Sequence, residues 1–299
     1  MAKEIVQNDL AKVAALCKEV LKNSYETIER MGGLTNHTYY VKLYDGNEYV
    51  VRIPGDGTEE LIVRADERVS TELACKLGID AKCLYFGKDG SKVTKYIDGA
   101  VTMSSETLKE ERHIDQMANI FQKLHQCGVD TGVPFEVFDM AAGYEKIIYD
   151  NQVMMYDDYQ EVKSTVMGIK RNIDSRCKIQ KVPCHNDALC ENWVEDSKKR
   201  MYLIDWEYAG MNDGFWDLAD VSIEAEYGAR EDRMLLTQYL KREPESLDWQ
   251  HFLANKIYVD YLWTLWAKTR VPFDGQPMED WATERYARLK YNIENFKSI

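Results

Sequence analysis

The sequence predicts an α+β protein with two lobes, a small one built on an antiparallel sheet and a larger one made mostly of helices. Five short β-rich segments precede residue 98, and one helical segment lies between the third and the fourth. Beyond residue 98 the hydrophobic period is mostly helical, apart from one β-like pair around residues 192–204. We therefore expect an N-terminal lobe at residues 1–97 and a C-terminal lobe at residues 98–299.

Changes of hydrophobic period place the elements of the small lobe. Residues 8–22 carry apolar side chains on one helical face, and Asn8 can cap that helix. Residues 58–77 form a second helical stripe, which Gly78 ends. The expected strands cover residues 25–31, 37–44, 48–53, 82–86 and 92–97. The turn Asp45-Gly46-Asn47 joins the second and third strands, so the sheet is expected to be antiparallel.

The larger lobe is expected to be helical on both sides of its β-like pair. The helical segments cover about residues 105–127, 140–150, 155–176, 215–228, 230–241, 245–269 and 279–297. The pair consists of residues 192–194 and 201–204, which bracket a polar turn.

Composition excludes several classes of protein. The chain has 299 residues, 38 basic and 51 acidic side chains and a net charge of −13, which disfavours binding to nucleic acid or to an anionic membrane. No apolar stretch is long enough to span a bilayer, and the N-terminus has no apolar signal region. Seven scattered cysteines without a C-x-x-C pair indicate free thiols in a reducing compartment, so we expect a cytoplasmic protein without a membrane or nucleic-acid partner.

The segment from Cys184 to Asn192, followed by Leu203-Ile204-Asp205, carries the most specific chemical signal. It contains Asp187, an asparagine five residues later and a second aspartate thirteen residues beyond that. Phosphoryl transfer to a hydroxyl needs a carboxylate to orient the acceptor, and an amide and a second carboxylate to hold Mg²⁺ on nucleotide phosphates. We therefore predict Asp187 as the catalytic residue, Asn192 and Asp205 as metal ligands, and ATP and Mg²⁺ as cofactors.

The spacing His-x-Asp-x₄-Asn, with Ile-Asp after an apolar run, resembles the core of the choline kinase and aminoglycoside phosphotransferase superfamily. The five strands with one helix match the small lobe of a protein-kinase-like fold. The resemblance covers nearly the whole chain and is strongest from residue 183 to residue 220. It implies supporting roles for His185, packed beneath the catalytic loop, and for Asp217, which braces that loop.

The small lobe carries the residues expected to bind nucleotide. Backbone N–H groups of a glycine turn can approach phosphate, so Gly33 is predicted to contact the nucleotide with Thr35 and Asn36; Gly32-Gly33-Leu34-Thr35-Asn36 also resembles the nucleotide loop of choline and ethanolamine kinases. Arg52 alternates with buried valines and can lie along the phosphates. Lys42 is a weaker competitor for that role. Glu67 is the expected partner of Arg52, and Glu72 is the alternative.

A pair of tryptophans indicates which alcohol accepts the phosphoryl group. Trp263 and Trp266 share one helical face, and the string Trp-x-x-Trp in this position resembles the choline-pocket helix of choline kinases. A quaternary ammonium has no N–H group, so aromatic faces must recognise it. Tyr208, three residues after the metal aspartate, is expected to complete the box.

A carboxylate is expected beside these rings to attract the cation. The resemblance points to Glu224, with Glu207 as the alternative.

These features predict an ATP- and Mg²⁺-dependent kinase that phosphorylates the hydroxyl of choline. The alternatives are an ethanolamine or other small-alcohol kinase and an aminoglycoside phosphotransferase. A pseudokinase-like scaffold, which binds nucleotide without turnover, is the alternative from a different class. Length and pattern resemble the bacterial choline/ethanolamine kinase family more than the longer animal enzymes.

Overall fold

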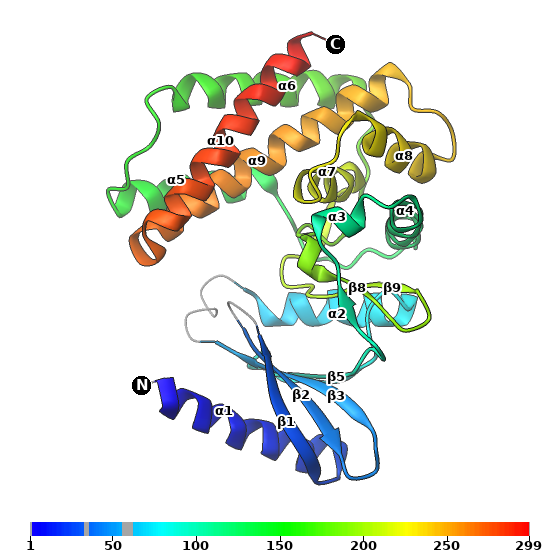
Figure 1. Cartoon of the computed structure of the whole chain (residues 1–299). Helices are drawn as coiled ribbons and strands as arrows, with labels where there is room; N and C mark the ends of the chain where they lie inside the picture. The colour runs from blue at the N-terminus through cyan, green and yellow to red at the C-terminus, as the bar shows by residue number, and fades with distance from the viewer. Residues whose placement is uncertain (1, 33–35, 56–61, 299) are drawn as a thin grey trace. The chain divides into compact units, whose positions relative to one another are not determined.

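The computed structural model describes residues 2–32, 36–55 and 62–298 (Figure 1). The chain divides into two compact units, and each is described by itself. The first unit comprises residues 1–103 and 191–209, and the second comprises residues 104–190 and 210–299. No helix in the described part of the chain is both long and apolar enough to cross a membrane.

The first unit is built on a five-stranded antiparallel sheet, as the sequence predicts. Its strand order is β1-β2-β3-β5-β4. The strands are β1 (Tyr25–Gly32), β2 (Asn36–Leu43), β3 (Glu48–Pro54), β4 (Cys83–Phe86) and β5 (Lys92–Lys95). In the β2–β3 hairpin Tyr39 lies opposite Val51, and in the β3–β5 pair Val51 lies opposite Val93. These apolar residues all lie on one face of the sheet, because side chains alternate between faces along a strand.

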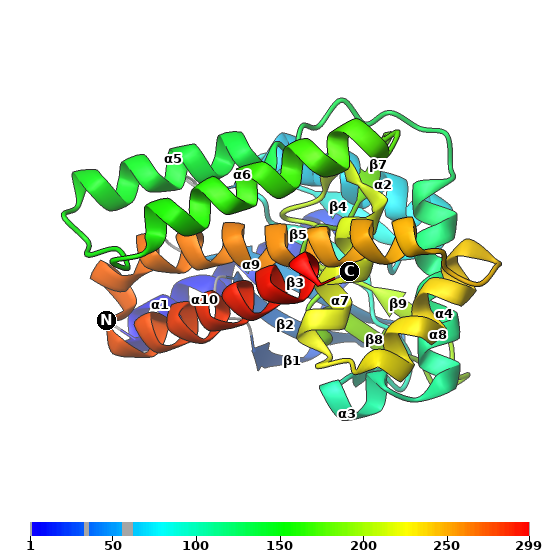
Figure 2. The same cartoon turned by 90° about the horizontal axis from the view of Figure 1, so that it is seen from above.

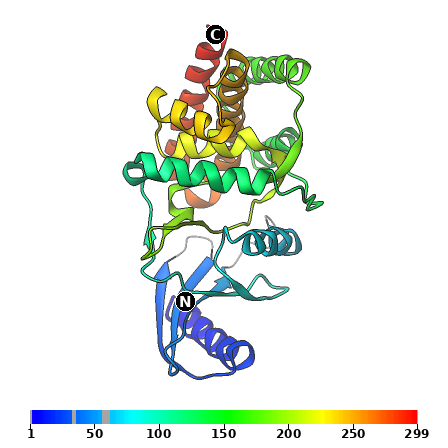
Figure 3. The ribbon, with the colours of Figure 1, turned by 90° about the vertical axis from the view of Figure 1, so that its right-hand side faces the viewer.

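Helix α1 (Ala2–Leu16), continued by a π-helical turn (Cys17–Leu21), covers that apolar face. Helix α1 lies against the sheet (Figure 3). Its residues Val13, Leu16 and Cys17 share one buried core cluster with sheet residues that include Val41 and Ile53. The helix predicted at residues 8–22 is therefore present, and it makes a second helix in this unit. Burial of this face leaves the opposite face of the sheet free to carry polar groups.

Helix α2 (Arg64–Leu77) is the helix between the third and fourth strands. It ends at Gly78, whose left-handed conformation (φ 66°) lets the following N–H groups return to the carbonyls of the last turn. The sequence-based range began at residue 58, but residues 58–61 lie outside the described part of the chain.

A second, three-stranded sheet also belongs to the first unit. It has the order β6-β8-β9, from β6 (Val101–Thr102), β8 (Trp193–Glu195) and β9 (Met201–Leu203). The pair β8–β9 is the β-like pair that the sequence predicts. Because β6 pairs with β8, and the Leu203 N–H donates to the Ile79 carbonyl, this hairpin belongs to the same compact unit as the large sheet. The boundary between the units therefore differs from the single division expected at residues 97 and 98.

The second unit is mainly helical, with one short antiparallel pair of strands. Its elements are α3 (Ser105–Leu108), α4 (Glu111–His125), α5 (Val137–Asp150), α6 (Tyr159–Arg176), β7 (Lys181–Cys184), β10 (Gly210–Asp213), α7 (Gly214–Glu224), α8 (Ala229–Leu240), α9 (Ser246–Asp274) and α10 (Gln276–Lys297). The long helix α9 packs against α5, α6, α7 and α10 (Figure 2). Strand β7 pairs with β10, a pairing that the sequence did not indicate. Strand β7 leads into the loop that holds Asp187, and β10 leads into α7.

Candidate active site

An ion pair predicted from the sequence lies on the polar face of the first unit's large sheet. Arg52 of β3 contacts Glu67 of α2, with 2.6 Å between Nη1 and Oε1, and both side chains are buried. Arg52 also donates through Nη2 to the Gly90 carbonyl at 2.8 Å. The alternatives lie elsewhere: Glu72 pairs with Arg68 on the exposed side of α2, and Lys42 pairs with Glu26.

Two further residues extend this pair into a cluster. Glu207 accepts hydrogen bonds from Arg64 at 2.6 Å and from Asn36 at 2.7 Å. Arg64 also donates to Glu67 at 2.8 Å. Glu207, the alternative carboxylate for the aromatic box, therefore lies with the predicted nucleotide residues of the first unit. Arg64 is a member of the cluster that sequence reasoning missed. Gly33 and Thr35, also predicted to contact nucleotide, lie outside the described residues.

The pKa values of Glu67 and Glu207 are shifted by the charges around them. Burial alone would raise the pKa of Glu67, but Arg52 and its other cationic neighbours outweigh burial and lower it. Burial and the neighbouring Asp205 carboxylate raise the pKa of Glu207. An added cation beside Asp205 would therefore relieve an unfavourable concentration of negative charge.

Asp205, predicted as a metal ligand, carries a carboxylate oxygen with no hydrogen-bond partner in the described part of the chain. It follows β9 in a left-handed conformation (φ 67°), and its Oδ1 lies 3.6 Å from Nη1 of Arg52. That Oδ1 atom is buried and has no hydrogen-bond partner among the described residues. Asn192 lies close by, because its carbonyl accepts the Ile204 N–H at 2.9 Å. A carboxylate and a carboxamide are hard oxygen donors of the kind that Mg²⁺ prefers, so the residues fit that ion.

Glu67 and Glu207 are poorer metal ligands. Their carboxylate oxygens and that of Asp205 all lie within 4.8 Å of one another. Arg52 lies 2.6 Å from Glu67 and Arg64 lies 2.6 Å from Glu207, whereas Asp205 Oδ1 is 3.6 Å from Arg52.

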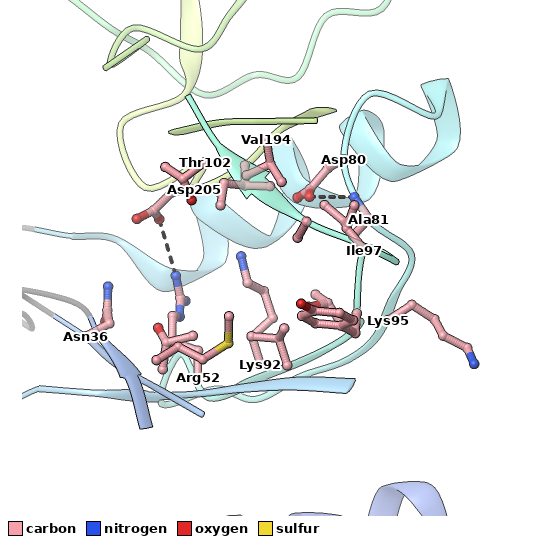
Figure 4. Close-up of a pocket in the computed structure, with 17 residues that line it drawn as sticks. Asn36, Arg52, Asp80, Ala81, Lys92, Lys95, Ile97, Thr102, Val194 and Asp205 are labelled. Atoms are coloured by element: carbon pink, nitrogen blue, oxygen red, sulfur yellow. Dashed lines mark hydrogen bonds and ion pairs between the residues drawn. The ribbon is translucent and has the colours of Figure 1, made fainter. Parts of the chain in front are cut away.

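A cavity of about 270 Å³ opens next to this cluster within the first unit (Figure 4). Arg52 and Asp205 line it, as do Asp80 and Lys92, whose side chain points into the space. Burial raises the pKa of Asp80 to about 6. Asp80 and Lys92 were not identified from the sequence, because a single Asp after a helix and a single Lys in a strand carry no spacing signal.

The loop that the sequence predicts to be catalytic lies in the second unit, between β7 and the 3₁₀ turn Cys190–Asn192. Asp217 of α7 accepts the His185 N–H at 2.9 Å and the Asn186 N–H at 2.8 Å. His185 is fully buried, and its Nδ1 accepts the Asp187 N–H at 3.3 Å. These contacts agree with the supporting positions expected for His185 and Asp217, and they hold the backbone on both sides of Asn186, which is left-handed (φ 67°).

Asp217→Asn should destabilise the protein by about 1–3 kcal/mol, because an amide can accept only one of the two buried N–H donors. Thermal or urea unfolding measures this. Asp150→Asn, at an exposed pair with Lys146, is the matched control and should change stability by less than about 1 kcal/mol. Equal effects of the two substitutions would contradict the bracing role.

Asp220 adds a second contact to the loop that the sequence did not indicate. It lies one turn after Asp217 on α7, is fully buried and accepts the Ala188 N–H at 2.5 Å. Its pKa is raised well above the usual range, first by burial and then by the charges of Glu224 and Asp187. Asp187 itself is half-buried.

The predicted tryptophan pair forms part of a larger aromatic cluster. The rings of Trp263 and Trp266 lie edge to face with centroids 6.0 Å apart. Trp281 of α10 continues the cluster at 6.1 Å from Trp266, and the guanidinium of Arg285 lies 4.1 Å from the Trp281 ring centroid. Tyr208 belongs to the first unit, so its place in the aromatic box stays a prediction.

Glu224 lies at the end of α7, in the same compact unit as Asp187. Its carboxylate is bound by Arg285, which also contacts Asp260 of α9. The sequence did not anticipate this engagement, because Arg285 is 61 residues away and belongs to another helix.

The five-stranded antiparallel sheet of the first unit and the mainly helical second unit define a kinase-like phosphotransferase fold. The profile of the choline/ethanolamine kinase family matches residues 28–264. The chain belongs to this family.

Individual relatives agree with this assignment. Protein LicA of Haemophilus influenzae is 28% identical over 264 residues, which cover 85% of this chain and 76% of the relative. A choline/ethanolamine kinase family protein from Mesorhizobium loti has a TM-score of 0.84 and 32% identity, covering 95% of each chain. The choline kinase LicA from Streptococcus pneumoniae has a TM-score of 0.80 and 29% identity, covering 96% of this chain and 99% of its own.

Proposed function

We propose that this protein transfers the γ-phosphoryl group of ATP to the hydroxyl of choline, in the presence of Mg²⁺, and releases phosphocholine and ADP. The observation that carries the choice of choline is the aromatic cluster of Trp263, Trp266 and Trp281 in the unit that holds Asp187. The similarity to the two LicA proteins supports the same choice, because the one from Streptococcus pneumoniae is described as a choline kinase.

Phosphoryl transfer depends mainly on alignment and on charge stabilisation. We propose that the Asp187 carboxylate accepts a hydrogen bond from the choline hydroxyl. As the new O–P bond forms and the bond between the γ-phosphorus and the bridging oxygen breaks, the hydroxyl proton passes to Asp187 and ADP leaves. Late proton transfer suffices, because a loose transition state places little charge demand on the attacking oxygen.

The first unit is proposed to hold the nucleotide. Arg52 would lie along the phosphates, oriented by its buried contact with Glu67. Asn36 would add a donor, as would Gly33 and Thr35. Asn192 and Asp205 would hold Mg²⁺, which when bound neutralises the phosphate charge.

The aromatic faces are proposed to hold the trimethylammonium group. Each ring contributes about 0.5–2 kcal/mol, depending on how far the contact is desolvated. Trp263 and Trp266 would supply faces from α9, and Tyr208 would complete the box. Glu224 is engaged with Arg285, so we propose that its carboxylate does not contact the head group directly.

Ethanolamine is the second candidate, because the family includes kinases for both alcohols. Its primary ammonium needs hydrogen-bond acceptors, and the carboxylates of Glu224 and Asp260 are occupied by arginines. Choline is therefore the better fit.

A coupled assay of ADP release over choline, ethanolamine, thiamine and aminoglycosides tests the proposal. We expect choline to give the highest kcat/KM and phosphocholine to be the product. ADP release that does not depend on any added alcohol would contradict the proposal and favour a nucleotide-binding scaffold.

Trp266→Ala should raise the KM for choline by about 2- to 30-fold while changing the KM for ATP little, because each lost ring face removes about 0.5–2 kcal/mol. Trp263→Ala should act in the same direction, with an added loss of stability because Trp263 is buried. Trp249→Ala, near the start of the same helix, is the matched control. If choline kinetics survive both substitutions intact, the aromatic-box hypothesis is wrong.

A further inference from the structure

Arg285 occupies a place whose chemistry suits a cationic head group. Its side chain is 4% exposed, and its guanidinium lies 4.1 Å from the centroid of the Trp281 ring. The same guanidinium binds the Glu224 carboxylate and lies 3.3 Å from Oδ1 of Asp260. An aromatic face together with a carboxylate is what a protein offers to an ammonium group.

This place is linked to the catalytic loop by one helix. Asp220 of α7 accepts the Ala188 N–H, directly after Asp187, and Glu224 lies one turn further along the same helix. Cys190, at the other end of the loop, donates through Sγ to the Glu224 carbonyl at 3.3 Å. The charges of Glu224 and Asp187 both raise the pKa of Asp220, so the two carboxylates lie within electrostatic range of one residue.

Glu224 and Asp260 have different arginine partners. Arg288 binds Asp260 through two nitrogens, at 2.7 and 2.9 Å, so Asp260 does not depend on Arg285 alone. Among the described residues, Arg285 is the cation that forms an ion pair with Glu224. Arginine remains charged at every working pH, so Glu224 stays neutralised as long as Arg285 holds it.

A neutralised Glu224 affects two head groups differently. A primary ammonium donates three hydrogen bonds to water, and it loses them when it enters the site. It therefore needs hydrogen-bond acceptors in the site to replace that hydration. A trimethylammonium group has no N–H and loses no such bonds, so it tolerates a site whose carboxylate is already occupied.

We propose that Arg285 is a specificity-determining residue, which occupies Glu224 and thereby leaves aromatic faces rather than a free carboxylate to select the head group. The consequence is discrimination against primary amino alcohols in favour of quaternary ones. This inference rests on the proposed function and names the residue that sets its selectivity.

Steady-state kinetics with choline and ethanolamine test the inference. In Arg285→Gln the ratio of kcat/KM for ethanolamine to that for choline should rise by about tenfold, because an accessible carboxylate can then accept charge-assisted hydrogen bonds. The change should appear mainly in the KM for ethanolamine. Arg285→Lys retains a cation beside Glu224 and should restore a ratio near that of the wild type.

Two control variants isolate the part of Glu224. Arg288→Gln removes the other cation bound to Asp260 and leaves the contact between Arg285 and Glu224 in place. The ratio should therefore stay within about twofold of the wild type, below the tenfold change that corresponds to about 1.4 kcal/mol. Adding Glu224→Gln to Arg285→Gln removes the freed carboxylate and should return the ratio toward the wild-type value.

Each outcome separates the inference from the proposed function. If the wild type phosphorylates choline but Arg285→Gln is folded and leaves the ratio unchanged, the inference fails and the proposed function stands. If the wild type phosphorylates neither alcohol, both fail. If Arg285→Gln does not fold, the single variant Glu224→Gln tests the inference. A ratio of kcat/KM values within about twofold of the wild type supports an occupied carboxylate. A fall in kcat/KM for choline or for ethanolamine of about tenfold or more overturns it.

Discussion

Asp205→Ala is expected to abolish Mg²⁺-dependent turnover, with kcat falling at least about 10³-fold. The Oδ1 atom of Asp205 is buried and accepts no hydrogen bond within the described part of the chain, so its lone pairs remain available to a metal ion. Glu67 and Glu207 cannot take over, because Arg52 and Arg64 already bind them. The measurement is ADP release as a function of Mg²⁺ concentration.

Asp205→Asn and an exposed control make this result interpretable. Asp205→Asn keeps one oxygen donor and should recover part of its activity at high Mg²⁺, whereas the alanine variant should not. Asp150→Ala removes an exposed aspartate and should leave turnover unchanged. Retained activity of Asp205→Ala at ordinary Mg²⁺ would refute its role as a ligand.

Asp187→Ala is expected to lower kcat by about 10²–10⁴-fold, the range typical of a positioned general base. Nucleotide binding should persist, because the residues proposed to hold ATP belong to the other compact unit. The loop itself should also persist, because Asp217 and Asp220 hold its backbone N–H groups independently of the Asp187 side chain.

Two measurements separate chemistry from binding for Asp187→Ala. Calorimetric titration with nucleotide should give a Kd close to that of the wild type, and steady-state kinetics should show the loss in kcat rather than in the KM for ATP. Unchanged turnover would remove Asp187 from the mechanism. A lost nucleotide affinity with an intact fold would assign it a binding role instead.

Local patterns in the sequence predicted the large sheet and narrowed the partner of Arg52 to Glu67 or Glu72. Alternation in β3 turns Val51 toward the apolar core and Arg52 toward the opposite face. Glu67, chosen for its position one helical turn after Arg64, faces inward, whereas its alternative Glu72 is exposed. Both patterns operate over a few residues, so a single sequence contains the needed information.

The division of the chain was less predictable. The hairpin β8–β9 follows the catalytic loop in sequence, yet it pairs with β6 and contacts Ile79, so it belongs to the compact unit of the large sheet. This arrangement depends on pairing between segments about 90 residues apart, for which hydrophobic periodicity gives no signal.

The charges around Glu224 were missed for a related reason. Arg285 and Asp260 lie on α10 and α9, and only the packing of these helices against one another and against α7 brings their side chains together. Each residue alone reads as an ordinary charge on an amphipathic helix. The tryptophan pair could be found because its spacing is local, but its third member, Trp281, could not.

A crystal structure with Mg²⁺, a non-hydrolysable ATP analogue and choline tests the central claim most directly. We expect oxygens of Asn192 and Asp205 at about 2.0–2.1 Å from Mg²⁺, the distance that this ion demands. We also expect the choline hydroxyl to lie within hydrogen-bond reach of Asp187, with its head group against the tryptophan rings. A complex in which Asp187, Asn192 and Asp205 point away from the phosphates would contradict the account.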